Sequence, residues 1–161
     1  MYLKDFEIRW SDVDANRHLA NAAYLNFMSH SRMTFLIDLG FDQQYIATEQ
    51  ISPVVFYEHM YYFKEVFLGA TIQVSVELKG MSADAKFFEF HHNFYNQKGE
   101  NVARCETMGG WIHLKNRKLT GVTAILLDKL NALEKTADFK VLTREDTRAF
   151  SKTPKALNSK K

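Results

Sequence analysis

One long apolar-rich segment, residues 21–39, constrains the fold more than any other feature of this sequence. If the segment is helical, its larger apolar residues share one broad face: Tyr24, Leu25, Phe27, Met28, Phe35, Leu36 and Leu39. A face that wide predicts a helix largely enclosed by other structure. We expect Asn21 to cap this helix and Gly40 to end it. Its length of about 28 Å would let it lie along a curved sheet.

The sequence on both sides of this segment has strand-like patterns. Residues 4–10 alternate, with Phe6, Ile8 and Trp10 on one side, as in a half-buried strand. Four β-rich stretches follow at residues 53–68, 71–79, 85–96 and 102–114, and we expect them to form two antiparallel hairpins. The turns between them are predicted at Gly69-Ala70 and at residues 96–99, with a bulge at Gly109-Gly110.

A second, shorter helix is predicted on the surface at residues 123–135, where the leucines share one stripe. The order of all these elements predicts an α+β fold, with an antiparallel sheet around one long central helix. The 161 residues, 46% of them hydrophobic, suffice for one domain with a substantial core. We assign residues 1–150 to this domain and expect residues 151–161 to form a basic flexible tail.

Composition argues against several functional classes. The formal net charge of +2 comes without a basic stripe, so we expect no nucleic-acid partner. The sequence has neither an apolar run long enough for a membrane span nor a hydrophobic N-terminal signal, so we expect a cytoplasmic protein without a span. The single cysteine, Cys105, fits a reducing compartment. His91 and His92 would point to opposite faces of a strand, and we expect neither metal nor cofactor.

The densest group of chemically able side chains lies in residues 11–21, just before the long helix. A carboxylate there can activate water or attack a carbonyl carbon. Backbone N–H groups at a helix start can receive the oxyanion that develops during such an attack. Asp, Asn and Ser are also common turn and capping residues, so composition alone leaves both interpretations open.

Residues 12–24, Asp-Val-Asp-Ala-Asn-Arg-His-Leu-Ala-Asn-Ala-Ala-Tyr, together with the long helix after them, resemble the signature of two hotdog-fold families. These are the 4-hydroxybenzoyl-CoA thioesterase-like and acyl-acyl carrier protein thioesterase-like families. The resemblance extends through the element order from about residue 4 to residue 116. It implies the hotdog fold and thioester hydrolysis. The sequence departs from the pattern at Arg17, where many coenzyme A (CoA) thioesterases have Gly, and at Ala20, where Asn is usual.

The resemblance also implies roles for individual residues. Asp14 corresponds to the catalytic carboxylate of these families, and Asn16 and His18 match the Asn and His of the plant-type acyl carrier protein thioesterases. Glu65 is a further catalytic candidate, because the sequence around it resembles the strand that supplies a water-positioning Glu.

Three neighbouring residues have structural interpretations beside the functional ones. We expect Asp12 to accept hydrogen bonds from loop N–H groups rather than to catalyse. Asn21 is interpreted as the helix cap and Tyr24 as a packing residue, and both are candidates for contacting the substrate.

The function implied is hydrolysis of an acyl-CoA or acyl carrier protein thioester to the free acid and the thiol, with Asp14 as general base or nucleophile. Edge strands and the aromatic stretch at residues 56–67 predict a homodimer or homotetramer. Two alternatives stay open. One is a hotdog enoyl-CoA hydratase or dehydratase, and the other is a non-catalytic module that binds or senses acyl thioesters.

Overall fold

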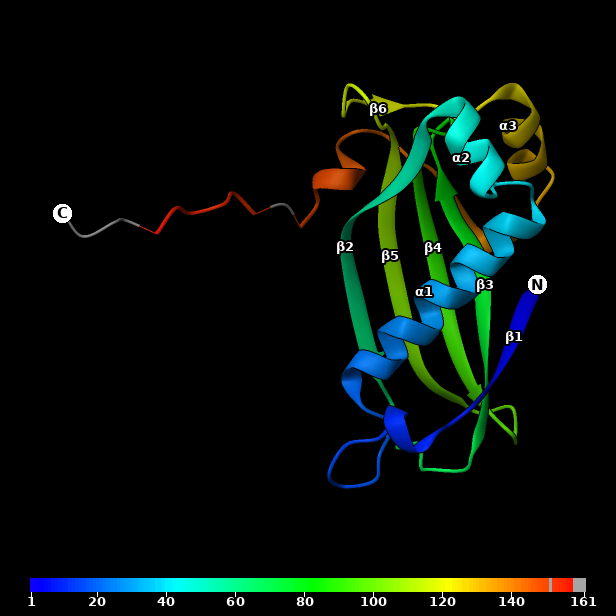
Figure 1. Ribbon diagram of the computed structural model, residues 1–161, viewed down its shortest axis with the longest axis vertical. Coiled ribbons are helices and arrows are strands. Elements are labelled where there is room, and N and C mark those ends of the chain that lie inside the picture. Colours follow the sequence, from blue (N-terminus) through cyan, green and yellow to red (C-terminus); the bar gives the residue numbers. More distant parts are fainter. Residues whose placement is uncertain (151, 158–161) are drawn as a thin grey trace.

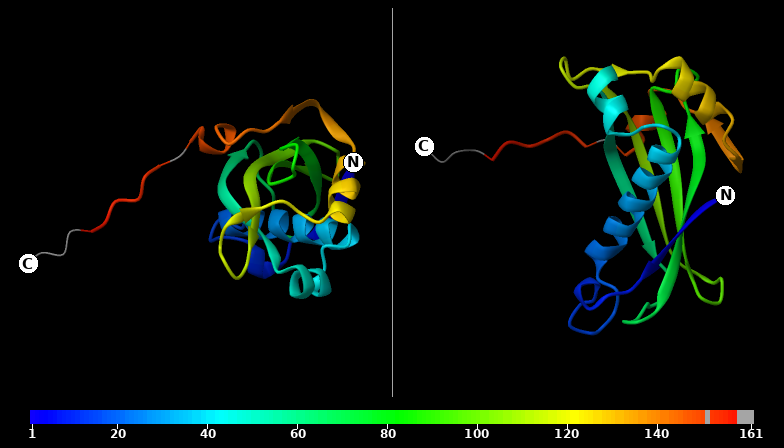
Figure 2. Two further views of the ribbon diagram at one scale, coloured as in Figure 1. Left: turned by 90° about the horizontal axis from the view of Figure 1, so that it is seen from above. Right: turned by 45° about the vertical axis from the view of Figure 1, so that its right-hand side comes forward.

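In the computed structural model, which describes residues 1–150 and 152–157, a curved sheet wraps around the long helix α1 (Asn21–Asp38). Figure 1 shows α1 lying diagonally across the sheet, and Figure 2 shows the sheet curling around it. The strands are β1 (Tyr2–Glu7), β2 (Ile51–Tyr62), β3 (Thr71–Met81), β4 (Phe87–Asn96), β5 (Asn101–His113), β6 (Leu119–Thr120) and β7 (Lys135–Val141). This α+β hotdog architecture confirms the predicted fold.

The main strand order is β1-β3-β4-β5-β2, which places β2 at an edge. The predicted hairpin between β4 and β5 is confirmed, with a turn at Gly99 (φ +75°). The predicted hairpin between β2 and β3 is wrong, because β2 pairs with β5 from Ile51 opposite His113 to Tyr62 opposite Ala103. The chain leaves the sheet after Tyr62, and residues 63–70 carry it across to the far side, where β3 begins.

Several boundaries differ from the predictions. β1 ends at Glu7, and Trp10 lies in the short 3-10 helix η1 (Trp10–Asp12) with 74% of its surface exposed rather than facing the core. The surface helix α3 is shorter than predicted (Ala124–Asn131), because the chain after it joins the sheet as β7. Helix α2 (Gln43–Glu49) and the 3-10 helix η2 (Asp146–Arg148) were not predicted.

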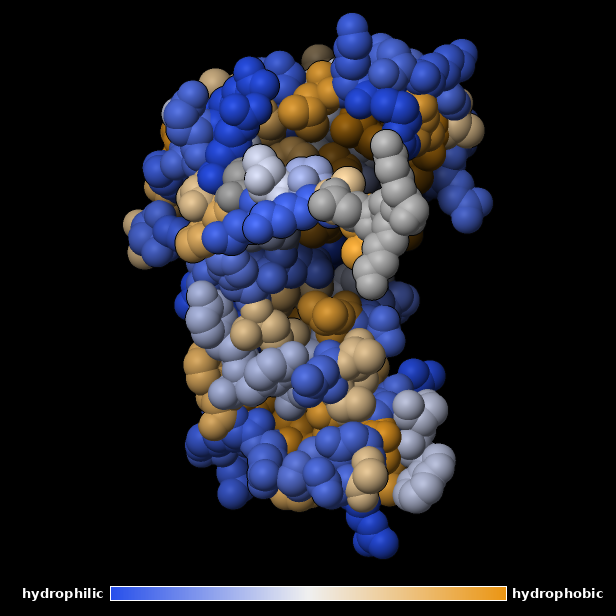
Figure 3. Space-filling view, turned by 90° about the vertical axis from the view of Figure 1, so that its left-hand side faces the viewer, coloured by the Kyte–Doolittle hydropathy of each residue, from blue (hydrophilic) through white to orange (hydrophobic). Residues whose placement is uncertain are grey.

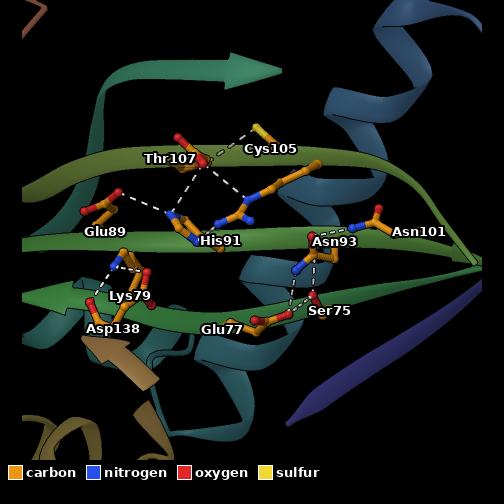
Figure 4. Close-up of polar contacts among 12 residues, drawn as sticks. Ser75, Glu77, Lys79, Glu89, His91, Asn93, Asn101, Cys105, Thr107 and Asp138 are labelled. Atoms are coloured by element: carbon orange, nitrogen blue, oxygen red, sulfur yellow. Dashed lines mark hydrogen bonds and ion pairs between the residues drawn. The ribbon is translucent and has the colours of Figure 1, made fainter. Parts of the chain in front are cut away.

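β7 joins the sheet parallel to β3, and no local sequence pattern predicted this pairing. An ion pair between Lys79 of β3 and Asp138 of β7 (Nζ–Oδ2 2.6 Å) supports it. Figure 4 shows this pair beside polar side chains of β3, β4 and β5 that bond to one another across the sheet. In that network Asn93 Nδ2 donates to Glu77 Oε1 (2.9 Å), and Asn101 Nδ2 donates to Asn93 Oδ1 (2.8 Å).

The core lies between α1 and the concave face of the sheet. The helix buries the broad face predicted for it, except that Leu25 is 38% exposed. On β4, His91 and His92 point to opposite faces as predicted: His91 contacts Glu89, whereas His92 is fully buried with Nδ1 2.9 Å from the carbonyl oxygen of Ser75. Among the described residues, no helix is long and apolar enough to cross a membrane.

The two glycines of β5 permit a close approach between strands. A Cβ on Gly109 would lie 2.5 Å from Cζ of Phe88 and 2.6 Å from the carbonyl oxygen of Val54, so only glycine fits there. The irregularity predicted at this point exists, but the extra residue is Phe56 on the partner strand β2.

Candidate active site

The loop before α1 holds Asp14 in a hydrogen-bonded turn. Oδ1 of Asp14 accepts the backbone N–H groups of Asn16 (2.8 Å) and His18 (3.1 Å). The main chain closes the same turn, since the N–H of Asp14 donates to the carbonyl of His18 (2.9 Å). No hydrogen bond within the described part of the chain reaches Oδ2, and the side chain is exposed rather than set in an apolar crevice. One oxygen is therefore fixed and the other is available.

Arg17 adopts an unusual backbone conformation in this turn. Its φ of +64° lies in the left-handed region, which disfavours every residue with a Cβ. This explains why Gly suits the position in related sequences. The turn forms here with Arg because the bonds to Asp14 on both sides of it determine the conformation.

A pocket of about 290 Å³ opens beside Asp14, between this loop, the start of α1 and the segment that follows β2. Its lining consists of Asp14, His18, Leu19, Asn21, Tyr24, Tyr62, Phe63, Lys64, Glu65 and Val66. Two backbone hydrogen bonds hold the separate segments together. The N–H of Leu19 donates to the carbonyl of Val66 (2.7 Å), and the N–H of Lys64 donates to the carbonyl of Val102 (3.0 Å).

The pocket thus brings together five of the six predicted site residues. His18 Nδ1 lies 3.6 Å from Glu65 Oε1, and the edge of the His18 ring packs against Phe67 with 5.0 Å between ring centroids. The sixth, Asn16, is exposed and does not line the pocket. It contributes its backbone N–H, which donates to Oδ1 of Asp14.

The start of α1 has no side-chain cap. The N-cap residue is Ala20, in an extended conformation (φ −68°, ψ 147°), so the prediction that Asn21 caps the helix is wrong. The register is set by the N–H of Ala20, which donates to the carbonyl of Asp12 (2.9 Å) and makes Asn21 the first helical residue. Within the described residues the N–H groups of Asn21 and Ala22 form no hydrogen bond, which leaves two donors at the start of α1. Asn21 lines the pocket, and Ala22 is the next residue of the helix.

Asp12 is a hydrogen-bond acceptor as predicted, but its donors are on Arg9 rather than in the loop. Its carboxylate accepts Nε and NH2 of Arg9 and the Arg9 backbone N–H, each at 2.9 Å. The side-chain hydrogen bonds from Arg9 lower the pKa of Asp12, so the buried carboxylate stays ionised and holds the turn that precedes the loop.

Tyr24 is a packing residue that also forms one pocket wall. Its ring lies between those of Tyr62 (5.2 Å between centroids) and Phe94 (5.3 Å). Burial raises the pKa of Tyr24 to about 12, so its hydroxyl is neutral near pH 7. Cys105 is fully buried, and burial raises its thiol pKa to about 11, which makes it unsuited to act as a nucleophile.

Beside Tyr24, the aromatic side chains of the site come from only one of two aromatic stretches in the sequence, residues 56–67 and residues 87–95. Tyr62 and Phe63, near the end of the first stretch, line the pocket. The second stretch, on β4, does not, because Phe88, Phe90 and Phe94 are buried in the core. Strand alternation in the sequence could have predicted that these residues lie in the core. It could not have predicted that Tyr62 and Phe63, at the end of β2, line a pocket.

Comparison with known proteins places this geometry in context. A family model described as the thioesterase-like superfamily matches residues 8–141. The L-carnitine dehydrogenase/betainyl-CoA thioesterase of Agrobacterium fabrum is 34% identical over 125 residues, which are 76% of this chain and 25% of that protein. This chain therefore spans about a quarter of the length of that curated relative.

Solved structures show the same fold at low sequence identity. A hypothetical protein from Staphylococcus aureus in complex with CoA has a TM-score of 0.77 at 15% identity, with 95% of this chain and 94% of that chain covered. A 1,4-dihydroxy-2-naphthoyl-CoA thioesterase from Synechocystis has a TM-score of 0.73 at 15% identity, with 82% and 96% covered.

Proposed function

The chain belongs to the thioesterase-like superfamily, and from this premise we propose that it hydrolyses an acyl-CoA thioester to the free acid and CoA, with Asp14 as the central chemical group. The observation that carries the proposal is one pocket lined both by Asp14 and by Asn21 at the start of α1. Among the described residues, Oδ2 of Asp14 accepts no hydrogen bond, and the N–H groups of Asn21 and the adjacent Ala22 donate none. The Agrobacterium relative is named for a CoA thioester, which supports CoA rather than acyl carrier protein as the carrier.

Asp14 can act by either of two routes. In the first, its free oxygen removes a proton from water while the water oxygen attacks the thioester carbonyl carbon. In the second, the oxygen attacks that carbon itself, and water then hydrolyses the mixed anhydride. In both routes the carbonyl oxygen becomes an oxyanion, the carbon–sulfur bond breaks, and the departing thiolate takes up a proton. The hydrogen bonds to Oδ1 support both routes because they hold the carboxylate in place.

The N–H groups of Asn21 and Ala22 are the proposed oxyanion donors. They belong to the first turn of a helix that has no capping side chain, so no acceptor in the described part of the chain competes with the substrate oxygen. The helix dipole adds partial positive charge at the same end. A single donor of this kind typically contributes a factor of about 100 to 1000 in kcat.

His18 and Glu65 are proposed to orient the attacking water. The two side chains lie 3.6 Å apart on the same pocket wall, and both are accessible to solvent. Asn16 supports the site through its backbone N–H to Asp14 rather than through its amide.

The test is thiol release from a panel of acyl-CoA thioesters by the parent protein and by Asp14→Asn. The amide keeps an oxygen that can accept the two turn hydrogen bonds, so we expect unchanged thermal unfolding and a loss of kcat by at least about 100-fold. Asp128→Asn on α3, exposed and outside the pocket, is the matched control and keeps full activity.

A folded Asp14→Asn protein with parental turnover would refute the proposal. Binding of acyl-CoA by the parent protein without thiol release would favour the sensor module instead. Addition of water to an enoyl-CoA without thiol release would favour the hydratase.

A further inference from the structure

Aromatic rings and carboxylates together line the pocket beside Asp14. Tyr24, Tyr62 and Phe63 supply the rings, and Asp14 and Glu65 supply the carboxylates. Tyr62 is 49% exposed and Phe63 is 55% exposed, so these two rings are open to a ligand. Purely apolar walls would be expected around a simple hydrocarbon chain, and this lining differs from them.

The rings form a corner of the pocket. The planes of Tyr24 and Tyr62 are nearly perpendicular, at 76° with 5.2 Å between centroids, and Phe63 follows on the same wall. The face of an aromatic ring carries partial negative charge and attracts cations, and clustered rings are a common way to bind quaternary ammonium groups.

The charges of the lining favour a cation as well. Two carboxylates, Asp14 and Glu65, are opposed by a single ammonium, that of Lys64. Nζ of Lys64 lies 2.7 Å from Oε1 of Glu100, which does not line the pocket, so its charge is already compensated. His18, 3.6 Å from Glu65, is the remaining titratable neighbour on this wall apart from the tyrosines. A positively charged ligand group would complete the balance.

The volume of the pocket can enclose only a short acyl group. At about 290 Å³ the pocket is at the lower end of the range for small-molecule sites, and it must also hold the thioester and a water molecule. A long hydrocarbon chain could not be enclosed there.

We propose that the acyl group of the substrate is short and carries a quaternary ammonium close to the thioester carbonyl, bound by the exposed rings of Tyr62 and Phe63 and by the carboxylates of Asp14 and Glu65. The inference rests on the proposed thioesterase function and names its substrate class. Betainyl-CoA, the thioester in the name of the Agrobacterium relative, is such a compound.

The decisive experiment compares betainyl-CoA with 3,3-dimethylbutanoyl-CoA, in which carbon replaces the charged nitrogen and the shape is retained. We expect kcat/KM to be at least about 10-fold higher for betainyl-CoA, since desolvated cation–π contacts reach about that effect or more. We expect Tyr62→Leu and Phe63→Leu each to lower the ratio of the two kcat/KM values several-fold, because kcat/KM falls for betainyl-CoA and not for the uncharged thioester.

Tyr61→Leu is the matched control. Tyr61 is adjacent on β2 and 43% exposed, but it points to the other face of the strand and does not line the pocket, so the ratio should not change. Thermal unfolding of each variant checks folding. If Tyr62→Leu fails to fold, Phe63→Leu alone carries the test, because its side chain is largely exposed.

The outcomes separate this inference from the proposed function. Equal kcat/KM for the two thioesters, or efficient hydrolysis of other acyl-CoAs but not of betainyl-CoA, overturns the inference and leaves the thioesterase function standing. If no acyl-CoA is hydrolysed, the proposed function fails. Calorimetry with non-hydrolysable thioether analogues of the two compounds then decides whether the pocket prefers the cation, and equal affinities overturn that preference too.

Discussion

At the scale of single residues, two features affect stability: the strained turn beside Asp14 and a deeply buried imidazole on β4. Arg17 has a left-handed backbone conformation in the turn that holds Asp14, and His92 on β4 is fully buried. Each residue has a measurable effect on stability that its identity alone does not reveal.

Replacing Arg17 should show the cost of the left-handed turn. The left-handed conformation costs a residue with a Cβ about 1–2 kcal/mol. Gly avoids this cost, but the greater freedom of Gly in the unfolded chain cancels part of the gain. We expect Arg17→Gly to be at least as stable as the parent protein and Arg17→Val to be clearly less stable, measured by denaturant unfolding. Ala15→Gly, without a positive φ, is the control and should lose stability. A destabilised Arg17→Gly protein would contradict this explanation of the turn.

His92 should make the protein sensitive to mild acid. Burial, with the charge of Arg32 as a second cause, lowers the pKa of His92 to about 3, whereas in the unfolded chain it titrates near 6.5. The folded state therefore binds fewer protons between these values. The stability from neutral His92 is complete above pH 6.5 and is lost as the pH falls below it, by about 2 kcal/mol between pH 7 and pH 5.

Urea unfolding at pH 7 and pH 5 measures this loss. We expect His92→Gln to be less stable than the parent at pH 7 but to lose much less on acidification, while His30→Gln, an exposed control on α1, keeps the parental pH dependence. Equal pH dependence in the parent and in His92→Gln would show that other groups cause the effect.

At the scale of elements, the start of α1 combines structural weakness with chemical use. A helix normally has Ser, Thr, Asp or Asn at its N-cap, and this one has Ala20. Without a cap, the N–H groups of Asn21 and Ala22 form no hydrogen bond among the described residues, and the proposed reaction needs these groups for its oxyanion.

Introducing a cap should stabilise the helix. Ala20 already has the extended conformation of an N-cap, so the side chain of Ala20→Asn can accept an N–H of the first turn, and we expect the free energy of unfolding to rise by about 1 kcal/mol. Ala22→Asn, an exposed position inside the first turn, is the control and should lower stability because Asn is a poorer helix former than Ala. The proposal for this helix end fails if both variants change stability in the same direction.

At the scale of the whole molecule, β2 is an edge strand with exposed apolar side chains. Val55, Phe56, Tyr61 and Tyr62 are each at least 36% exposed, and apolar residues are visible on this side of the molecule in Figure 3. Unprotected edges of this kind promote pairing with another strand. We therefore keep the prediction of a homodimer or homotetramer.

Sedimentation velocity can test self-association through this edge. We expect the parent protein to sediment as a dimer or tetramer and Val55→Lys to shift toward the monomer, because a charged residue on an edge strand opposes pairing. Ile125→Lys introduces the same charge at a more exposed site on α3 and should leave the mass unchanged. A monomeric parent protein would contradict the prediction.

The basic flexible tail predicted at residues 151–161 stays a prediction. Ser151 and residues 158–161 lie outside the described residues, and the exposed residues 152–157 form no helix or strand.

Local sequence patterns determined the central helix, most strand positions and the loop that carries Asp14. Side-chain periodicity and glycine positions act within one segment, so they predict that a segment is helical or extended wherever its neighbours lie. The resemblance of residues 12–24 to known families added the roles of Asp14 and His18, and pointed to Glu65.

Only the tertiary structure decided which segments meet. The backbone groups of a strand can pair with any other strand, so nothing local selected β5 rather than β3 as the partner of β2, or added β7 beside β3. The same holds for the site. Tyr62, Phe63 and Glu65 line one pocket with Asp14 because of long-range main-chain contacts such as that between Leu19 and Val66. The N-cap is Ala20 rather than the predicted Asn21 because the N–H of Ala20 donates to the carbonyl of Asp12. These contacts join residues distant in sequence or fix a helix register, and neither is encoded in periodicity.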